Sequence, residues 1–495
     1  MLDQLNLLLW LPLLGAVAQA FLPSHVSRTV GLALSLIASI LGFVEFSQLS
    51  SSGTASVEHM NWIGSYGISY LLSFDGLNAL PVLLVSICFP MLLLFEWNAE
   101  DGRRGLYAPI LLLQSALAGL LLAQDLFLLF FFLALSSLPI YFLGALWGGK
   151  DREKGSVRFL VVSSLSIGLF FLAALTVYFS IEPHQFELAK LAASDIATKT
   201  IPIFGADILV SKLAFWLFLA SALTRLPVWP AHSWFLSLTR CARPSVLVAI
   251  LGIFCPVTFF IFARLLMALF PTELKEASGF LLTIGLTNAF IPGLLALSSS
   301  RLRETISYLA LSQFGFLWIG LSTLQGVSLV GMYFQVFGCG TALVGITLLF
   351  GILKRRIQNS EDDFEFRKFP IEGLHQKSPF LASVAGLVLV ALIGFPGLST
   401  FVGQYLLFMG SFTVSPWIVL GLALSSCVVA ASCIRVFHGL FLSETAGERW
   451  DPLAPIERVV FMPVLAIAMI AGIVPRPFID LLKPMIDGLL KVANG

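Results

Sequence analysis

The chain has 495 residues, of which 58% are hydrophobic and only 12% are charged, and its formal net charge at pH 7 is +1. Soluble globular domains carry about 25% charged residues, so this composition excludes a soluble enzyme or binding domain. A net charge this close to zero also argues against nucleic acid as a partner, because nucleic-acid binding depends on a basic surface. The composition therefore predicts an all-α polytopic membrane protein that lies in the lipid bilayer.

Fourteen apolar stretches are each long enough to cross a bilayer as a helix of about 20 residues. We expect them to form a single membrane domain over residues 1–495, with centres near residues 13, 39, 86, 114, 136, 168, 221, 257, 289, 312, 340, 396, 428 and 469. The loops that follow odd-numbered stretches hold 20 of the 29 Lys and Arg residues. Positive loops stay in the cytoplasm, so both termini are expected on the non-cytoplasmic side.

The seventh stretch contains Arg225 and is then interrupted at Pro227, shortly before His232. A charge at membrane depth is costly and by default functional, and a proline-broken helix at that depth is typical of a transport site. No Asp or Glu lies at the centre of any other stretch. The isolated charge therefore points to transport, whereas the missing carboxylates argue against a working proton pump.

The twelfth stretch is broken at Pro396 and Gly397, and it lies five stretches after the first break. An odd offset reverses the direction of the second copy through the membrane, as in inverted-topology repeats with broken helices at corresponding positions. We therefore expect two inverted five-helix repeats, over residues 105–270 and 279–443, with helices seven and twelve discontinuous. One proline kink alone is common in membrane helices, but two at matched positions favour a transport-type fold.

The sequence predicts no metal site, no cofactor and no catalytic residue on this chain. It has no Rossmann glycine pattern, and its cysteines lack CxxC spacing. We interpret the cysteines as small hydrophobic residues, most of them buried. They are Cys88, Cys241, Cys255, Cys339, Cys427 and Cys433.

Several short motifs follow one another in an order that resembles a known family. They run from Trp62 to Leu77, Asp125 to Gly149, Arg225 to Trp234, Arg301 to Gly315, Phe395 to Gln404 and Pro475 to Phe478. In this order they resemble the antiporter-like membrane subunits of respiratory complex I, of the chain M type, which are related to Mrp antiporter and membrane-bound hydrogenase subunits. The resemblance covers roughly residues 60 to 485. It implies a place among other membrane-arm subunits of an NADH:quinone oxidoreductase, in the inner membrane of a bacterium.

The resemblance also implies a row of titratable residues at the membrane midplane, and this chain departs from it at nearly every position. The family's Glu on helix five aligns with Ala134, its Lys on helix seven with Arg225, and its Lys on helix eight with Pro256. The His on helix eleven aligns with Cys339, and the Lys or Glu on helix twelve with Gln404. Ala, Gln and Pro cannot relay a proton, and Arg is not deprotonated in proteins. We expect carbonyls, hydroxyls or amides around Arg225.

Two functions of different kinds stay open from the sequence, and a third is a variant of them. The first is a non-redox subunit whose own proton channel is impaired or lost and which acts as a spacer. The second is an active proton or cation translocator that uses Arg225, His232 and water. Gln404 is a further candidate for an ion path. The third is an Mrp-type or hydrogenase-type complex with the same fold. The hydroxyls of Ser136 and Ser137 are interpreted as helix-packing groups rather than parts of a wet path.

Overall fold

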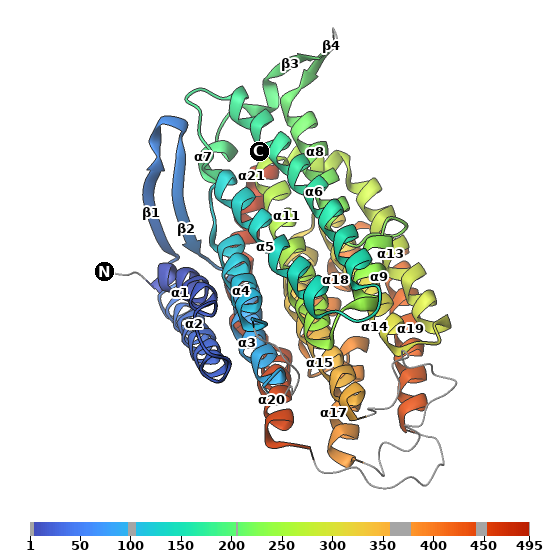
Figure 1. The fold of residues 1–495 in the computed structure, drawn as a ribbon. Helices are drawn as coiled ribbons and strands as arrows, with labels where there is room; N and C mark the ends of the chain where they lie inside the picture. Colours follow the sequence, from blue (N-terminus) through green and yellow to red (C-terminus); the bar gives the residue numbers. More distant parts are fainter. Residues whose placement is uncertain (1–3, 98–104, 204–205, 357–377, 442–452, 495) are drawn as a thin grey trace.

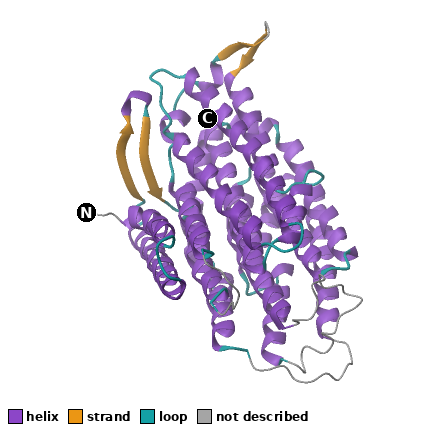
Figure 2. Ribbon diagram, viewed as in Figure 1, coloured by secondary structure: helices purple, strands orange, loops and turns teal. Residues whose placement is uncertain are grey.

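The computed structural model describes residues 4–97, 105–203, 206–356, 378–441 and 453–494. Helices dominate it, and two short antiparallel hairpins accompany them (Figure 2). The helices are α1 (Gln4–Ala18), α2 (Ser24–Ser52), α3 (Ala79–Phe95), α4 (Tyr107–Leu122), α5 (Leu126–Trp147), α6 (Arg152–Ser180), α7 (Leu188–Ala192), α8 (Val210–Arg225), α9 (Ser233–Cys241), α10 (Pro244–Leu247), α11 (Cys255–Leu269), α12 (Pro271–Glu276), α13 (Ser278–Ser298), α14 (Leu302–Thr323), α15 (Gly326–Arg356), α17 (Pro379–Ile393), α18 (Ser399–Val414), α19 (Pro416–Phe441), α20 (Pro455–Ile473) and α21 (Arg476–Asn494). The other elements are the strands β1 (Ser56–Ile63), β2 (Ile68–Phe74), β3 (Thr200–Ile203) and β4 (Ala206–Leu209), the 3-10 turns η1 (Gly64–Tyr66) and η2 (Ile196–Thr198), and the π-helix η3 (Val248–Phe254).

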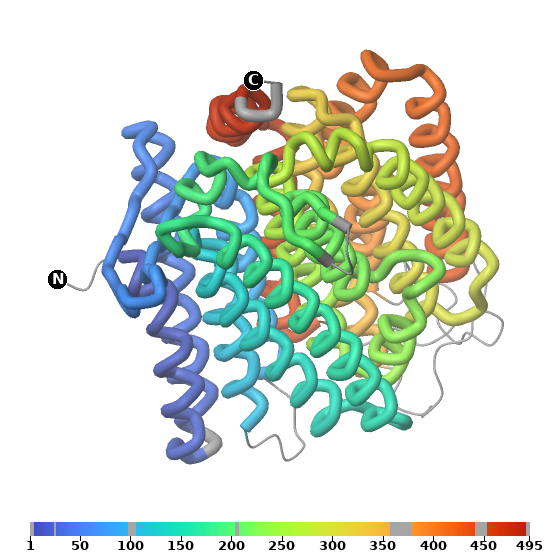
Figure 3. Tube along the Cα trace, turned by 90° about the horizontal axis from the view of Figure 1, so that it is seen from above, coloured from blue at the N-terminus to red at the C-terminus, as the bar shows by residue number. Residues whose placement is uncertain are grey.

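The long helices run roughly parallel to one another (Figure 1). Seen from above, α1 and α2 lie at one edge of the array, and α13 and α19 lie toward the opposite edge (Figure 3). Within the described ranges, nine helices have at least 18 residues and are apolar enough to cross a membrane, and four shorter apolar helices have 10–17 residues. The polytopic helical membrane fold is confirmed, and the number of fourteen spans stays a prediction.

The two hairpins lie toward the same end of the helix array (Figure 1). The larger one, β1–β2, is fixed to the start of α5 by the side chain of Asp125. One oxygen of Asp125 accepts hydrogen bonds from the N–H groups of Phe127 and Leu128 and so caps the helix. The other oxygen accepts the N–H of Ser69 in β2 at 3.1 Å. A single carboxylate therefore sets both the start of α5 and the position of the hairpin.

Both expected helix breaks are present. Helix α8 ends at Arg225 because Leu226 precedes a proline, which disfavours helical backbone; Leu226 is extended, with φ −82° and ψ 141°. Helix α17 ends where Gly394 turns into the left-handed region at φ 84°, and Gly397 follows at φ 95°. The discontinuities predicted around Pro227 and Pro396 are confirmed by this backbone geometry.

A third irregularity, not predicted from the sequence, precedes α11. The backbone over η3 is a π-helix, and α11 follows it without a loop. Pro256 has no N–H to donate to the carbonyl of Gly252, four residues earlier, so the regular helical ladder is interrupted there. Short π-helical segments of this kind recur at functional sites. This one brings Phe254 and Cys255 to the neighbourhood of the first break.

Helices α15 and α18 pack with their backbones in contact. Four glycines allow this approach, Gly331 and Gly338 on α15 and Gly403 and Gly410 on α18. A Cβ at any of the four would come closer than 3.0 Å to a backbone atom of the opposite helix. Small residues at helix interfaces are a common device of membrane proteins, because they let backbones approach closely.

Basic side chains from neighbouring helices bind the C-terminal ends of other helices. Arg303 of α14 donates to three carbonyls at the end of α9, at 2.6–3.0 Å. Arg435 of α19 donates to two carbonyls at the end of α13. Arg28 of α2 and Arg152 of α6 donate to one carbonyl each at the ends of α3 and α5. These carbonyls have no partner within their own helix, and positive charge there is favoured by the helix dipole.

Five of the six cysteines are buried, as expected, and Cys427 is exposed. The amphipathic helix α21 at the C-terminal end was not predicted. It packs against α15, α11 and α12. A Cβ on Gly76 would overlap a carbonyl of α21, so the chain entering α3 lies directly against this helix.

Candidate functional site

Arg225 is the last residue of α8, and only 1% of its surface is exposed. Its guanidinium donates hydrogen bonds to three groups of α5. They are the hydroxyl of Ser137 at 3.0 Å, the hydroxyl of Ser136 at 2.7 Å and the carbonyl oxygen of Leu133 at 3.0 Å. The surroundings predicted for Arg225, namely hydroxyls and carbonyls, are therefore observed.

The fourth neighbour of Arg225 is the ring of Phe254, whose centroid lies 4.8 Å from the guanidinium carbon. Such a cation–π contact contributes about 0.5–2 kcal/mol, with the larger value where water is excluded. Phe254 ends the π-helix, so the irregular backbone before Pro256 is what presents the ring. Helices α5, α8 and the η3–α11 segment thus meet at one buried charge.

No carboxylate is bonded to Arg225 among the described residues, and its Nε atom has no partner there. A buried charge without a counter-ion is costly, so the three hydrogen bonds and the ring are what compensate its desolvation. The position aligned with the family's Glu is Ala134, which adjoins the contact face of α5 and carries no polar group. Among the described residues, the site therefore holds a positive charge that is bonded to two hydroxyls and a carbonyl and to no carboxylate.

His232 is placed apart from the Arg225 contacts. It lies seven residues further along the chain, at the N-cap of α9, on the far side of the break. Its ring faces Tyr308 of α14, with centroids 6.3 Å apart in an edge-to-face arrangement. His232 is half-buried. The two residues proposed to share an ion path thus contact different helices, α5 for Arg225 and α14 for His232.

The second break is surrounded by neutral amides. Gln313 of α14 donates from Nε2 to the carbonyl oxygen of Leu392, next to the end of α17, at 2.9 Å. Gln335 of α15 donates in turn to Oε1 of Gln313 at 3.0 Å. Gln404 of α18 packs its amide against Gly394, where a Cβ would overlap it. All three glutamines are buried, and none of them titrates.

The remaining aligned position, Cys339, lies buried on α15, and its thiol donates to a carbonyl of its own helix. Three features of the site were not predicted from the sequence: Gln335, the contact of the two serines with Arg225, and Asn288 of α13. Asn288 accepts the N–H of Trp229 inside the first break at 2.9 Å. An uncharged amide in an apolar stretch was the available signal, since such a group must find partners when it is buried.

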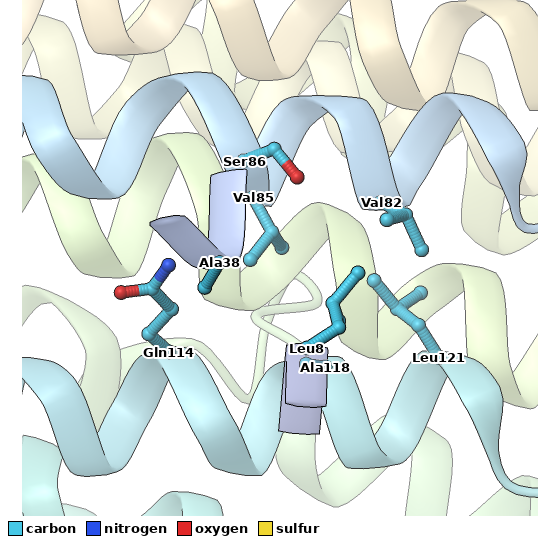
Figure 4. A pocket seen from close by; sticks show the side chains of 8 residues that line it. All are labelled: Leu8, Ala38, Val82, Val85, Ser86, Gln114, Ala118 and Leu121. Atoms are coloured by element: carbon cyan, nitrogen blue, oxygen red, sulfur yellow. The ribbon is translucent and has the colours of Figure 1, made fainter. Parts of the chain in front are cut away.

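A small cavity is found away from both breaks, between α1, α2, α3 and α4 (Figure 4). Its volume is about 10 Å³, which is room for about one water molecule. The lining is mostly aliphatic, with Ser86 and Gln114 as its polar members. It does not reach Arg225 or the amides of the second break, and the described residues hold no cluster of metal-ligating side chains.

A helical membrane array with two helices interrupted inside it, each bonded to a neighbouring helix at the interruption, defines a transport-type membrane fold. A family model described as NADH:quinone oxidoreductase/Mrp antiporter, TM, matches residues 123–430. The chain belongs to this family.

Curated relatives are similar over most of their length. NADH-quinone oxidoreductase subunit M of Rhodobacter capsulatus is 24% identical over 448 residues, which is 89% of this chain and 86% of the relative. Subunit M of Escherichia coli (strain K12) is 26% identical over 469 residues, 91% of this chain and 89% of the relative. The resemblance to chain M type subunits found in the motifs is thereby confirmed.

Solved structures share the fold. A chain of respiratory complex I from Thermus thermophilus superposes with a TM-score of 0.86 at 22% identity, covering 99% of this chain and all (100%) of that one. A chain of the Mrp complex from Dietzia sp. DQ12-45-1b superposes with a TM-score of 0.81 at 18% identity, covering 100% of both chains.

Proposed function

We propose that this chain is a non-redox membrane-arm subunit of a complex I-like NADH:quinone oxidoreductase, in which it acts as a spacer whose own proton path is impaired or lost. Its partners would be the neighbouring membrane-arm subunits, and its place would be the inner membrane of a bacterium with both termini on the non-cytoplasmic side. The curated relatives named subunit M and their coverage of nearly the whole chain support the choice of complex.

The observation that carries the proposal is the set of contacts around Arg225. A proton relay needs groups that gain and lose protons, and a carboxylate–lysine pair does so because each tunes the other's affinity. Here the cation is an arginine, and its partners are two serine hydroxyls and a carbonyl. None of these four groups changes its charge near neutral pH.

The second break supports the same proposal from the other half of the molecule. Gln313, Gln335 and Gln404 hold the break with hydrogen bonds and packing but offer no titratable atom. At the four glycines between α15 and α18, the two backbones approach so closely that not even a Cβ would fit. In our proposal the repeats over 105–270 and 279–443 keep the shape of two half-channels and lack the chemistry of both.

The experiment is to replace Arg225 by Met and to measure protons moved per electron in reconstituted vesicles. We expect Arg225→Met to lower the amount of assembled complex, because three hydrogen bonds lose their donor and α8 is no longer tied to α5. The complex that does assemble is expected to move as many protons per electron as the wild type. The wild type and Arg225→Met are compared at equal amounts of assembled complex.

A matched control is Arg158→Met. Arg158 is exposed, and it also donates to a serine hydroxyl, that of Ser237 at 2.6 Å. This variant removes an arginine–serine contact outside the break, so its assembly should stay near the wild-type level. A clear fall in protons per electron for Arg225→Met alone would reject the spacer. It would favour the alternative, a translocator that uses Arg225, His232 and water.

A further inference from the structure

Asn288 lies in the middle of α13 and is fully buried, with 0% of its surface exposed. Its amide connects two other segments of the chain. The oxygen accepts the N–H of Trp229, inside the first break, at 2.9 Å. The nitrogen donates to the carbonyl oxygen of Leu311 on α14, also at 2.9 Å. One side chain on a continuous helix therefore links the first break to α14.

The connection continues along α14 through three consecutive residues. Leu311 receives the hydrogen bond from Asn288, and Ser312 returns one to the carbonyl of Ala289 at 2.5 Å. Gln313, the next residue, donates to the carbonyl of Leu392 at the second break at 2.9 Å. The two breaks are thus linked by the hydrogen bonds of Asn288 and Gln313, which are joined through the backbone of α14.

The two helices that carry this run are in backbone contact. A Cβ on Gly315 of α14 would overlap the backbone of Ala289, and a Cβ on Gly285 of α13 would come within 2.7 Å of the backbone nitrogen of Ile319. Glycines at these crossings leave no side-chain layer that would deform between the helices. The pair α13–α14 is therefore a stiff body with one polar contact to each break.

We propose that Asn288 and Gln313 are positioning residues that hold the two helix breaks in a fixed relation, so that a shift at one break is transmitted to the other. The proposal concerns the mechanics of the fold and does not depend on whether protons flow through the chain. Buried amides suit this role because each unmade hydrogen bond would leave a polar group without a partner in an apolar interior. Such a loss disfavours independent movement of either break.

The test is hydrogen–deuterium exchange of the backbone at both breaks, measured in the assembled membrane complex. Asn288→Leu keeps the branched outline and the number of heavy atoms of the side chain and removes both hydrogen bonds. We expect exchange to become about fivefold to tenfold faster over residues 226–232 and also over 394–398. Thr287→Val is the matched control, because within the described part of the chain the hydroxyl of Thr287 bonds to carbonyls of its own helix. This variant should leave the exchange of both segments unchanged.

A second variant, Gln313→Met, alters the contact at the second break. Gln313→Met removes the bond to Leu392 and the acceptor of Gln335, and we expect faster exchange at the first break as well as at the second. Coupling between two sites is reciprocal, so both variants must act on both segments. If one of the two variants does not assemble, the exchange rates of the other are enough to test the proposal. Acceleration confined to the break that the altered residue contacts, in whichever variant assembles, would overturn the proposal.

Discussion

Arg225 and its partners illustrate how a charge is kept in an apolar interior without a counter-charge. The guanidinium is planar and weakly hydrated, and it presents several N–H donors in fixed directions. Three hydrogen bonds go to α5, and the ring of Phe254 covers the group from the η3 side. A lysine would bring a compact, more strongly hydrated charge to the same place. The arginine therefore suits a permanent structural charge better than a proton carrier.

Gly394, at the second break, is a position where we expect any side chain to be costly. Its φ of 84° is a conformation that side chains disfavour, and a Cβ would also overlap the amide of Gln404. We expect Gly394→Ala to destabilise the assembled complex by about 2–3 kcal/mol, from backbone strain and overpacking together. The measurement is the thermal unfolding temperature of the purified complex.

Gly397 supplies the control for this variant. Its φ is 95°, yet no atom lies within 4 Å of a Cβ built there. Gly397→Ala should therefore show the strain alone, about 1–2 kcal/mol. Adding Gln404→Ala should restore part of the loss in Gly394→Ala and leave Gly397→Ala unchanged. Equal losses for both glycines, with no effect of Gln404→Ala, would show that the amide does not press on Gly394.

The two broken helices are each bonded to a neighbouring helix, but they take opposite parts in the hydrogen bond. Helix α8 ends in a donor, Arg225, which binds α5. Helix α17 ends in an acceptor, the carbonyl of Leu392, which binds Gln313 of α14. The broken helix is the donor at the first break and the acceptor at the second. In each case the partner is an uninterrupted helix, α5 at the first break and α14 at the second. Beyond the second break, α18 is in backbone contact with α15 through four glycines.

The glycine contact predicts a strong dependence on side-chain size. A Cβ on Gly410 would overlap the backbone of Ser328 on α15, so Gly410→Ala must push α18 away from α15. We expect it to cost about 1–3 kcal/mol and to lower the yield of assembled complex. Gly168→Ala on α6 is the control, because a Cβ there meets nothing within 4 Å. It should be neutral or stabilising by up to about 1 kcal/mol. Equal yields for the two variants would contradict a tight α15–α18 contact.

At the scale of the whole molecule, the sequence predicted the features with strong local signals and missed those made by distant contacts. Proline and glycine placed both breaks correctly, because they act on their own backbone. Arg225 was found because a charge is rare in an apolar stretch. The partners of Arg225, the amide of Asn288 and the π-helix depend on which helices meet, and that information is not local. Ser136 was interpreted as a helix-packing residue, but its partner across the helices, Arg225, was not predicted.

The acid–base pair of the family can be restored by two substitutions. Ala134→Glu together with Arg225→Lys would place titratable groups where the family has them. We expect no gain in protons per electron, because the described side chains that hold the second break are the amides of Gln313, Gln335 and Gln404, which do not titrate. The same vesicle assay checks this outcome, with Arg225→Lys alone as the control. A rise in the double variant would mean that one pair is enough for conduction.

The arginines at the helix ends have a consequence for how the chain is made. Arg28, Arg152, Arg303 and Arg435 lie in or beside loops predicted to be cytoplasmic, where positive charge orients a nascent chain during insertion. In the folded protein the same side chains bind carbonyls of other helices. If these loops are cytoplasmic as predicted, the same positive charges direct insertion of the chain and later bind the ends of neighbouring helices. Replacing Arg303 by Lys would keep the positive charge that directs insertion. It would remove the guanidinium that binds three carbonyls at the end of α9, so the variant separates the two roles of this charge.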